Sequence, residues 1–506
     1  MTGLLLTGCG VSRNIANDGA PLTEEEKTAD FRYFFRTMLD GNPAIGEYGE
    51  LYGFSFAERK AFYENSVLQT KDDYEFYCVM SAIGLEIPSF HTDLVEPDPA
   101  VYRSLHCYNR REVDRREILE GCERWQTLIR EGAEPYKEDG FFVFSYVDGE
   151  YVLNRIYSTQ PEIKEAAVLI SVDGVPADSF ITEHLFLSGL HYDGANEKIY
   201  RSSLIFGDTH GEDVVLRVKT MGGEISEINA KLSLYAAEAF LYDRVSDELS
   251  DPLMSYECRE YAYLRIDSFS PATAEYTSAF LSDCENDNVI IDLRECYGGK
   301  TDYAAKNIYP YLYADSLCFR KHWYIPKTEV NTPLTRGLVN RIMLKLRSAE
   351  DCPYSAQSKY LQSEIETEYT GKRSADRTVY LLCGRGTGSA ADTFTAILKD
   401  RQLACVIGNN TGGEGLMNSY MVRLCPNSGL AFVYMPGGAK NADGTDNSVY
   451  GTAPDVYVNQ SAEDFLRMMQ FEENGETVSD PDRLLQVDTV LRKAVEMIRQ
   501  DDSSMD

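Results

Sequence analysis

The chain has 506 residues, of which 43% are hydrophobic and 26% are charged, and it therefore predicts roughly two to four globular domains. Its formal net charge is −32. So large an excess of negative charge repels phosphate backbones and anionic lipid headgroups, which disfavours a nucleic-acid partner.

The cysteines predict buried free thiols rather than a disulfide framework or a metal site. All 12 occur singly, without the CxxC pairs or Cys/His spacings of zinc sites. Several lie in apolar runs, such as Cys383 in VYLLCG and Cys405 in LACVIG. A chain of this length can bury sizeable cores without disulfides. We expect no metal and no cofactor.

The N-terminus carries a pattern for lipid attachment. The segment Leu6-Thr7-Gly8-Cys9 resembles a bacterial lipobox, and a polar, linker-like stretch follows it. Only eight residues precede Cys9 and none is Lys or Arg, so either the chain is truncated at its start or the match is chance. We interpret residues 1–23 as a truncated lipoprotein signal and linker. The pattern predicts lipidation at Cys9 and an extracytoplasmic bacterial lipoprotein tethered to the cell membrane.

Residues 24–135 predict a helical N-terminal domain. The segment TADFRYFFRTML places apolar residues at the i, i+3, i+4 and i+7 positions of an amphipathic helix. The run DDYEFYCVMSAIGLEI continues the helical pattern until Pro88.

Residues 140–235 predict a β-rich module built from hairpins. The segment FFVFSYVDGEYVLNRIY reads as two strands around Asp148-Gly149, and DVVLRVKTMGGEISEINAKL as two strands around Gly222-Gly223. The segment ISVDGVPADSF, with another Asp-Gly turn, resembles part of a PDZ domain, which binds peptides by strand addition. The alternative interpretation is a spacer that positions the remainder of the chain.

Residues 255–506 predict an α/β core. Strands and helices alternate from YAYLRIDSF through NVIIDLR, TVYLLCG, ADTFTAILKD and ACVIG, and NVIIDLR is apolar enough to be buried on both faces. Residues 323–370 interrupt this rhythm and are interpreted as a polar, partly helical insertion. From Ala462 to about Gln500 the chain predicts helix, with one apolar face. This face comprises Leu484, Val487, Leu491, Val495 and Ile498.

Three glycine-rich loops follow predicted strands of this core, in IIDLRECYGG, GRGTGSAADTF and ACVIGNNTGGEG. Ser389 stands where the second loop enters a helix, where the helix dipole favours an oxyanion. Each loop alone is a weak signal, because such loops also bind phosphates and Ser is a common N-cap. The three loops in this order are more specific.

The order DLR…GG, GTGSAADTF…LKD, VIGNNTGG and GTAPDVYV resembles the C-terminal-processing (tail-specific) proteases and their tricorn-core and retinoid-binding-protein relatives, over residues 261–458. The resemblance implies a crotonase/ClpP-like α/β core and a peptide or protein substrate with a free C-terminus. It implies Ser389 as nucleophile and an oxyanion hole formed by the amides of Ala390 and of Gly298 or Gly299.

The catalytic base departs from the Ser–Lys pattern of that family. Members with the dyad carry their lysine 25 residues after the serine, a position that Glu414 occupies here. The tricorn-like branch takes a histidine from the leader instead, and His91 in PSFHTDL suits that role. The carboxylate that orients His91 is left open between Glu414 and Asp446, although Ser448 stands nearer the position that the branch uses.

The function expected from these residues is a serine endopeptidase acting on exported proteins or peptides. The missing lysine motivates one alternative, a catalytically inactive peptide-binding or scaffold protein on the same fold. A second alternative is an acyl-CoA enzyme on a crotonase-like core, which the net charge of −32 disfavours because CoA carries phosphates.

Overall fold

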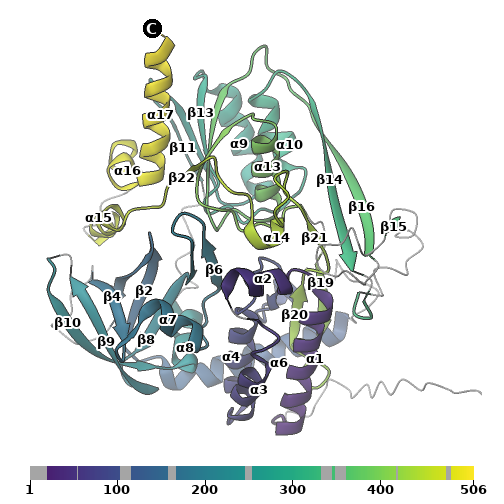
Figure 1. The fold of residues 1–506 in the computed structure, drawn as a ribbon, viewed down its shortest axis with the longest axis vertical. Helices are drawn as coiled ribbons and strands as arrows, with labels where there is room; N and C mark the ends of the chain where they lie inside the picture. Colours follow the sequence, from purple (N-terminus) through teal and green to yellow (C-terminus); the bar gives the residue numbers. More distant parts are fainter. Residues whose placement is uncertain are drawn as a thin grey trace, which may run out of the picture.

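A computed structural model gives the fold and describes residues 20–53, 55–102, 115–157, 167–220, 222–244, 253–326, 328–331, 345–347, 360–416, 420–473 and 480–505 (Figure 1). The predicted lipidation site, Cys9, lies outside these residues. In the described part no helix is both long and apolar enough to cross a membrane. The cysteines of that part are free thiols, and most are buried, as predicted.

The N-terminal segment is helical, as its apolar periodicity predicts. Thr23 and Glu26 form a capping box at the start of the first helix, and the side chain of Asp72 caps α4. The helices bury a core rich in aromatic side chains, among them Phe31, Phe34 and Trp125. The helices are α1 (Glu24–Gly41), α2 (Ile45–Tyr52), α3 (Lys60–Leu68), α4 (Asp73–Gly84) and α6 (Arg115–Ala133).

The β-rich module contains the predicted hairpins. Asp148 and Gly149 adopt left-handed φ angles of 46° and 89°, as a two-residue hairpin turn requires. The strands form a sheet of order β3-β2-β8-β10-β9-β4-β5, and one further pairing joins β3 to β4. They are β2 (Phe141–Val147), β3 (Glu150–Ile156), β4 (Ala167–Val172), β5 (Val175–Pro176), β8 (Ser203–Gly207), β9 (Glu212–Thr220) and β10 (Ile225–Leu232).

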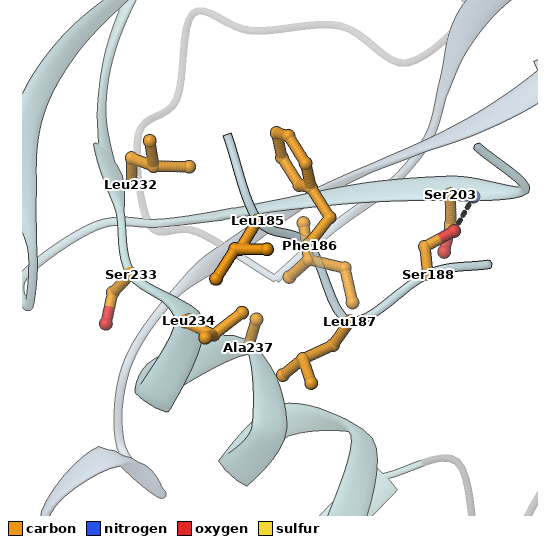
Figure 2. A pocket seen from close by; sticks show the side chains of 10 residues that line it. Leu185, Phe186, Leu187, Ser188, Ser203, Leu232, Ser233, Leu234 and Ala237 are labelled. Carbon is orange, nitrogen blue, oxygen red and sulfur yellow. Dashed lines mark hydrogen bonds between the residues drawn. The ribbon is translucent and has the colours of Figure 1, made fainter. Parts of the chain in front are cut away.

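Two helices and a separate hairpin complete the module. The helices are α7 (Ala177–Glu183) and α8 (Leu234–Arg244), and the hairpin is β6 (Leu190–Asp193) with β7 (Lys198–Arg201). An apolar pocket lies between the segment 185–188 and the start of α8 (Figure 2). At its edge the Ser203 amide donates to Ser188 Oγ at 2.9 Å. The PDZ-like character of the module stays a prediction.

The α/β core is a six-stranded sheet covered on both faces. Its order is β11-β12-β13-β17-β18-β22, with parallel pairing from β12 to β22 and an antiparallel edge at β11. Side chains of α9, α10 and α13 pack in the core on one face, and the predicted apolar stripe of α16 and α17 packs in the core on the other. The strands are β11 (Leu253–Glu257), β12 (Ala262–Ile266), β13 (Asn288–Asp292), β17 (Thr378–Cys383), β18 (Cys405–Gly408) and β22 (Val456–Tyr457). The helices are α9 (Pro271–Asp283), α10 (Tyr303–Asn307), α13 (Ser389–Asp400), α14 (Asn447–Tyr450), α15 (Ala462–Glu473), α16 (Pro481–Val487) and α17 (Thr489–Met505).

The interpretation of residues 323–370 as partly helical was wrong for the part that the structure describes. Strands β14 (Leu317–Pro326) and β16 (Tyr360–Tyr369) instead form an antiparallel ribbon with ten residue pairs (Figure 1). Strand β15 (Lys345–Arg347) pairs with β16, and β21 (Gly438–Ala439) pairs with β14. Each strand of the ribbon finds its partner far along the chain. Local periodicity carries no information about such a partner, so the strands were missed.

The helical leader and the core share a small sheet. Strand β1 (Asp93–Leu94) pairs antiparallel with β20 (Ala431–Tyr434), which also pairs with β19 (Met421–Leu424). Phe432 and Tyr434 are therefore buried in the aromatic core of the leader helices. Because β1 begins two residues after His91, this sheet fixes the segment that carries His91 against the loops of the core.

The ribbon is fixed to the core partly through Asp446. Its carboxylate accepts a hydrogen bond from Tyr324 Oη at 3.0 Å and caps the short helix α14 through the Ser448 amide at 2.9 Å. The side chain is completely buried. Burial raises the pKa of Asp446 to about 7, and the nearby carboxylate of Glu47 adds to the effect.

We predict that Asp446 makes stability fall as the pH rises. A carboxyl group whose pKa is higher in the folded than in the unfolded protein binds its proton more tightly in the folded state. The contribution is favourable below the ordinary pKa near 4, is lost as the pH rises to about 7, and amounts to roughly 4 kcal/mol at most. Between pH 5 and 8 the unfolding free energy of Asp446→Asn should fall less than that of the wild type.

Urea unfolding at several pH values measures this slope. Asp443→Asn, an exposed carboxylate in the same loop, is the matched control and should keep the wild-type slope. Equal slopes for wild type and Asp446→Asn would show that the carboxyl group is not the source.

Candidate active site

Ser389 lies at the entry of a helix with an unusual backbone conformation. Strand β17 ends at Cys383, a glycine-rich loop follows, and α13 begins at Ser389 itself. The φ angle of Ser389 is +52°, in the left-handed region that residues with a side chain rarely occupy. Such strain costs about 1–3 kcal/mol and occurs most often at functional sites. The Ser389 amide donates to the Gly413 carbonyl at 3.0 Å, which ties the serine to the loop after β18.

The glycine pair after β13 lies against this serine. Gly298 has a φ of 94°, and a Cβ atom on it would lie 2.8 Å from the Ala390 nitrogen and 2.9 Å from Ser389 Cβ. Gly299 is packed instead on Phe269, whose carbonyl oxygen would lie 2.5 Å from a Cβ atom. Of the two glycines predicted for an oxyanion hole, Gly298 is therefore the one whose backbone lies beside the Ala390 amide.

Phe90 holds the His91 segment against the glycine-rich loop that precedes Ser389. Cβ atoms on Gly388 and Gly412 would lie 2.4 Å and 2.6 Å from the Phe90 ring, so the ring occupies space that only glycines leave open. Arg385 adds a polar link by donating to the carbonyls of Pro88 at 3.1 Å and Gly412 at 3.2 Å. A segment of the helical leader is thereby locked onto two loops of the α/β core.

His91 contacts Glu414, one of the two carboxylates that the sequence left open. Glu414 Oε2 lies 2.8 Å from His91 Nδ1, and Glu414 Oε1 accepts a hydrogen bond from Ser89 Oγ at 2.5 Å. Glu414 is buried, and the Tyr420 ring stacks on the imidazole at a centroid distance of 5.6 Å. Asp446 binds Tyr324 and Ser448 instead.

The pairing with Glu414 determines which nitrogen of His91 can act as a base. If Nδ1 donates its proton to the carboxylate, Nε2 carries a lone pair and can accept a proton. The His91 ring and the Ser389 hydroxyl, both described, share no hydrogen bond in this structure. Such contacts are often long in the absence of substrate and tighten when the substrate binds.

Asp392 organises the loops behind the nucleophile. It lies on α13, is completely buried, and accepts hydrogen bonds from four groups in two loops and in the short helix α14. Burial raises the pKa of Asp392, and the bonds to it oppose this effect. The donors are Thr411 Oγ1 at 2.5 Å, Thr452 Oγ1 at 2.7 Å, Asn447 Nδ2 at 3.0 Å and the Gly415 amide at 3.1 Å.

Lys321 is a residue of the site that sequence reasoning missed. It reaches from the ribbon strand β14 and donates to the Gly415 carbonyl at 3.0 Å and to Thr393 Oγ1 at 3.2 Å. Burial lowers the pKa of Lys321 to about 8. No sequence signal indicated it, because Lys321 lies next to the segment interpreted as an insertion. In the described ranges, no three or more His, Cys, Asp or Glu side chains gather as a metal site.

Comparisons with known proteins agree with this architecture. Residues 260–458 match the model of Peptidase family S41. The crystal structure of mature CPAF is similar over 92% of this chain and 98% of that chain, with 13% identity and a TM-score of 0.50. The structure of mature CPAF complexed with lactacystin is similar over 94% of this chain and 99% of that chain, with 13% identity and a TM-score of 0.51. The photosystem II D1 C-terminal processing protease is matched over 86% of this chain and 94% of that chain, with 13% identity and a TM-score of 0.37. No curated protein matches the chain.

The two CPAF structures support the fold, and the family match covers the α/β core with all three glycine-rich loops. The predicted serine-peptidase core is therefore confirmed at the level of the family. Residues 260–458 thus form a core of the S41 peptidase type, which is the core of a serine-type peptidase.

Proposed function

We propose that Ser389, His91 and Glu414 form the catalytic triad of this peptidase. The observation that carries the proposal is the 2.8 Å contact of Glu414 Oε2 with His91 Nδ1, on a segment that Phe90 fixes to the nucleophile loop. Glu414 stands where the Ser–Lys members of the family carry their lysine. The imidazole of His91, held by the Glu414 carboxylate, therefore takes the role of base that the lysine has in those members.

The mechanism follows from the positions of these groups. His91 Nε2 takes the proton of Ser389 as Oγ attacks the carbonyl carbon of the scissile peptide bond. Glu414 holds the imidazole by Nδ1 and stabilises the imidazolium. The amides of Ala390 and Gly298 bind the oxyanion, and the positive end of α13 favours the same charge. The imidazolium protonates the leaving amine, and water then hydrolyses the acyl-enzyme with His91 again as base.

A fluorophosphonate probe tests the triad directly, because it labels only an activated serine. Ser389→Ala should abolish labelling, and His91→Ala and Glu414→Gln should each slow it, by about 100-fold or more for His91→Ala. His210→Ala, a half-exposed histidine of the β-rich module, is the control and should label at the wild-type rate. Labelling of folded Ser389→Ala, or a wild-type rate for His91→Ala, would refute the assignment.

Gly298 offers a second test that leaves every triad residue intact. We expect Gly298→Ala to slow labelling by about 10- to 1,000-fold, because its methyl group would displace the Ser389–Ala390 backbone from the oxyanion site. Gly174→Ala is the matched control. Gly174 has a similar left-handed φ of 80°, but no atom lies within 4 Å of the added Cβ. A Gly174→Ala effect as large as that of Gly298→Ala would attribute the loss to backbone strain alone.

We further propose that the substrates are exported proteins or peptides and that lipid on Cys9 tethers the enzyme outside the cytoplasm. The lipobox-like segment and the polar stretch after it support this proposal. Expression of the full chain in a bacterium with labelled palmitate should label the wild type but not Cys9→Ala, and Cys9→Ala should lose membrane association. Equal membrane association of both proteins would contradict the tether.

A further inference from the structure

The β-rich module contacts the loop that carries Glu414. Strand β6 ends at Asp193, and β18 is followed at once by Asn409. Asp193 Oδ1 accepts a hydrogen bond from Asn409 Nδ2 at 2.7 Å, and the neighbouring Gly194 amide donates to Asn409 Oδ1 at 3.2 Å. The Asn409 amide group is thus held from both ends by two consecutive residues of the module.

The Asp193 carboxylate is a buried hydrogen-bond acceptor and not a solvent-exposed charge. Its side chain is only 1% exposed, and both carboxylate oxygens are occupied. Burial alone would raise the pKa of Asp193, but the bonds from Asn196, Asn409 and Tyr146 leave it below the usual value. The remaining donors are the Ala195 amide at 2.9 Å, the Asn196 amide at 3.2 Å, Tyr146 Oη at 2.8 Å, Asn196 Nδ2 at 2.9 Å and Asn459 Nδ2 at 3.0 Å.

The loop from Asn409 to Glu414 is short and tightly bound. The Thr411 amide donates to Thr452 O at 3.0 Å, the Gly412 amide donates to Thr387 O at 2.8 Å, and the Gly413 carbonyl accepts from Ser389. Glu414 follows with a strained φ of +60°. Because the residues between Asn409 and Glu414 are hydrogen-bonded to neighbouring loops, we expect a displacement of Asn409 to shift Glu414 as well. Asn409 is the residue of this loop that the module holds.

We propose that Asp193 is a positioning residue for the reaction, which acts through Asn409 on the loop that places Glu414 against His91. The inference rests on the role proposed for Glu414. It adds a residue of the β-rich module to the catalytic apparatus of the core. It also makes the contact of that module with Asn409 a condition for rapid acylation of Ser389.

The experiment measures the saturating rate of fluorophosphonate labelling, the probe concentration at half saturation, and the unfolding midpoint of the full chain. Asp193→Ala should lower the saturating rate by about 10- to 100-fold with little change in half-saturation. Asp193→Asn should recover part of the rate, because an amide oxygen can still accept from Asn409. Asn409→Ala combined with Asp193→Ala should be no slower than the slower single variant, because both substitutions break one contact.

Asp139→Ala is the matched control for stability. Asp139, just before β2, is a buried carboxylate that accepts bonds from the Thr209 amide at 2.9 Å and the His210 amide at 3.3 Å, in a turn of the same module. The Asp139→Ala substitution should lower the unfolding midpoint without slowing fluorophosphonate labelling. A similar loss of rate in Asp139→Ala, or independent effects of the Asp193 and Asn409 variants, would overturn the proposal.

Failure of the positioning role of Asp193 can be distinguished from failure of the proposed triad. If His91→Ala and Glu414→Gln are slow while Asp193→Ala labels at the wild-type rate, only the positioning role fails. If His91→Ala and Glu414→Gln label normally, the triad itself fails.

Discussion

The contact between His91 and Glu414 joins positions 323 residues apart, and the proposed triad depends on it. A serine hydroxyl needs a base, and the proposed base, His91, lies on a segment of the helical leader, outside the α/β core that carries Ser389. Three features keep that segment in place: the pairing of β1 with β20, the Phe90 ring between two glycines, and the bonds from Arg385. The proposed triad is therefore complete only when the leader is docked.

Backbone strain occurs where the three glycine-rich loops of the core meet, as well as at turns elsewhere. Ser389 and Glu414 are non-glycine residues with positive φ, and Gly298 adopts a positive φ beside them. Such conformations persist only when the surroundings over-determine them. Asp392 and Lys321 provide these surroundings, because each is buried and bonds the backbone or side chains of the loops around α13. Rigidity of this kind preorganises the site before a substrate binds.

Much of the fold could be predicted because its signals are local. The helical periods of α1 and α17, the Asp-Gly turns of the module, and the apolar strands β13 and β17 are written in neighbouring residues. The ribbon of β14 and β16 could not be recognised, because each strand is defined by a partner far away in the chain. For the same reason Lys321 gave no sign that it belongs to the site.

The sequence by itself determined the chemical kinds of group available: a serine at a helix start, glycine-rich loops at strand ends, and one histidine in a suitable segment. It also excluded a lysine at the family's usual position. Only the tertiary structure decided which carboxylate meets His91, which glycine lies beside Ala390, and that Asp193 holds Asn409. These are distances between segments remote in sequence, and such distances are set by packing and strand pairing, which no local pattern encodes.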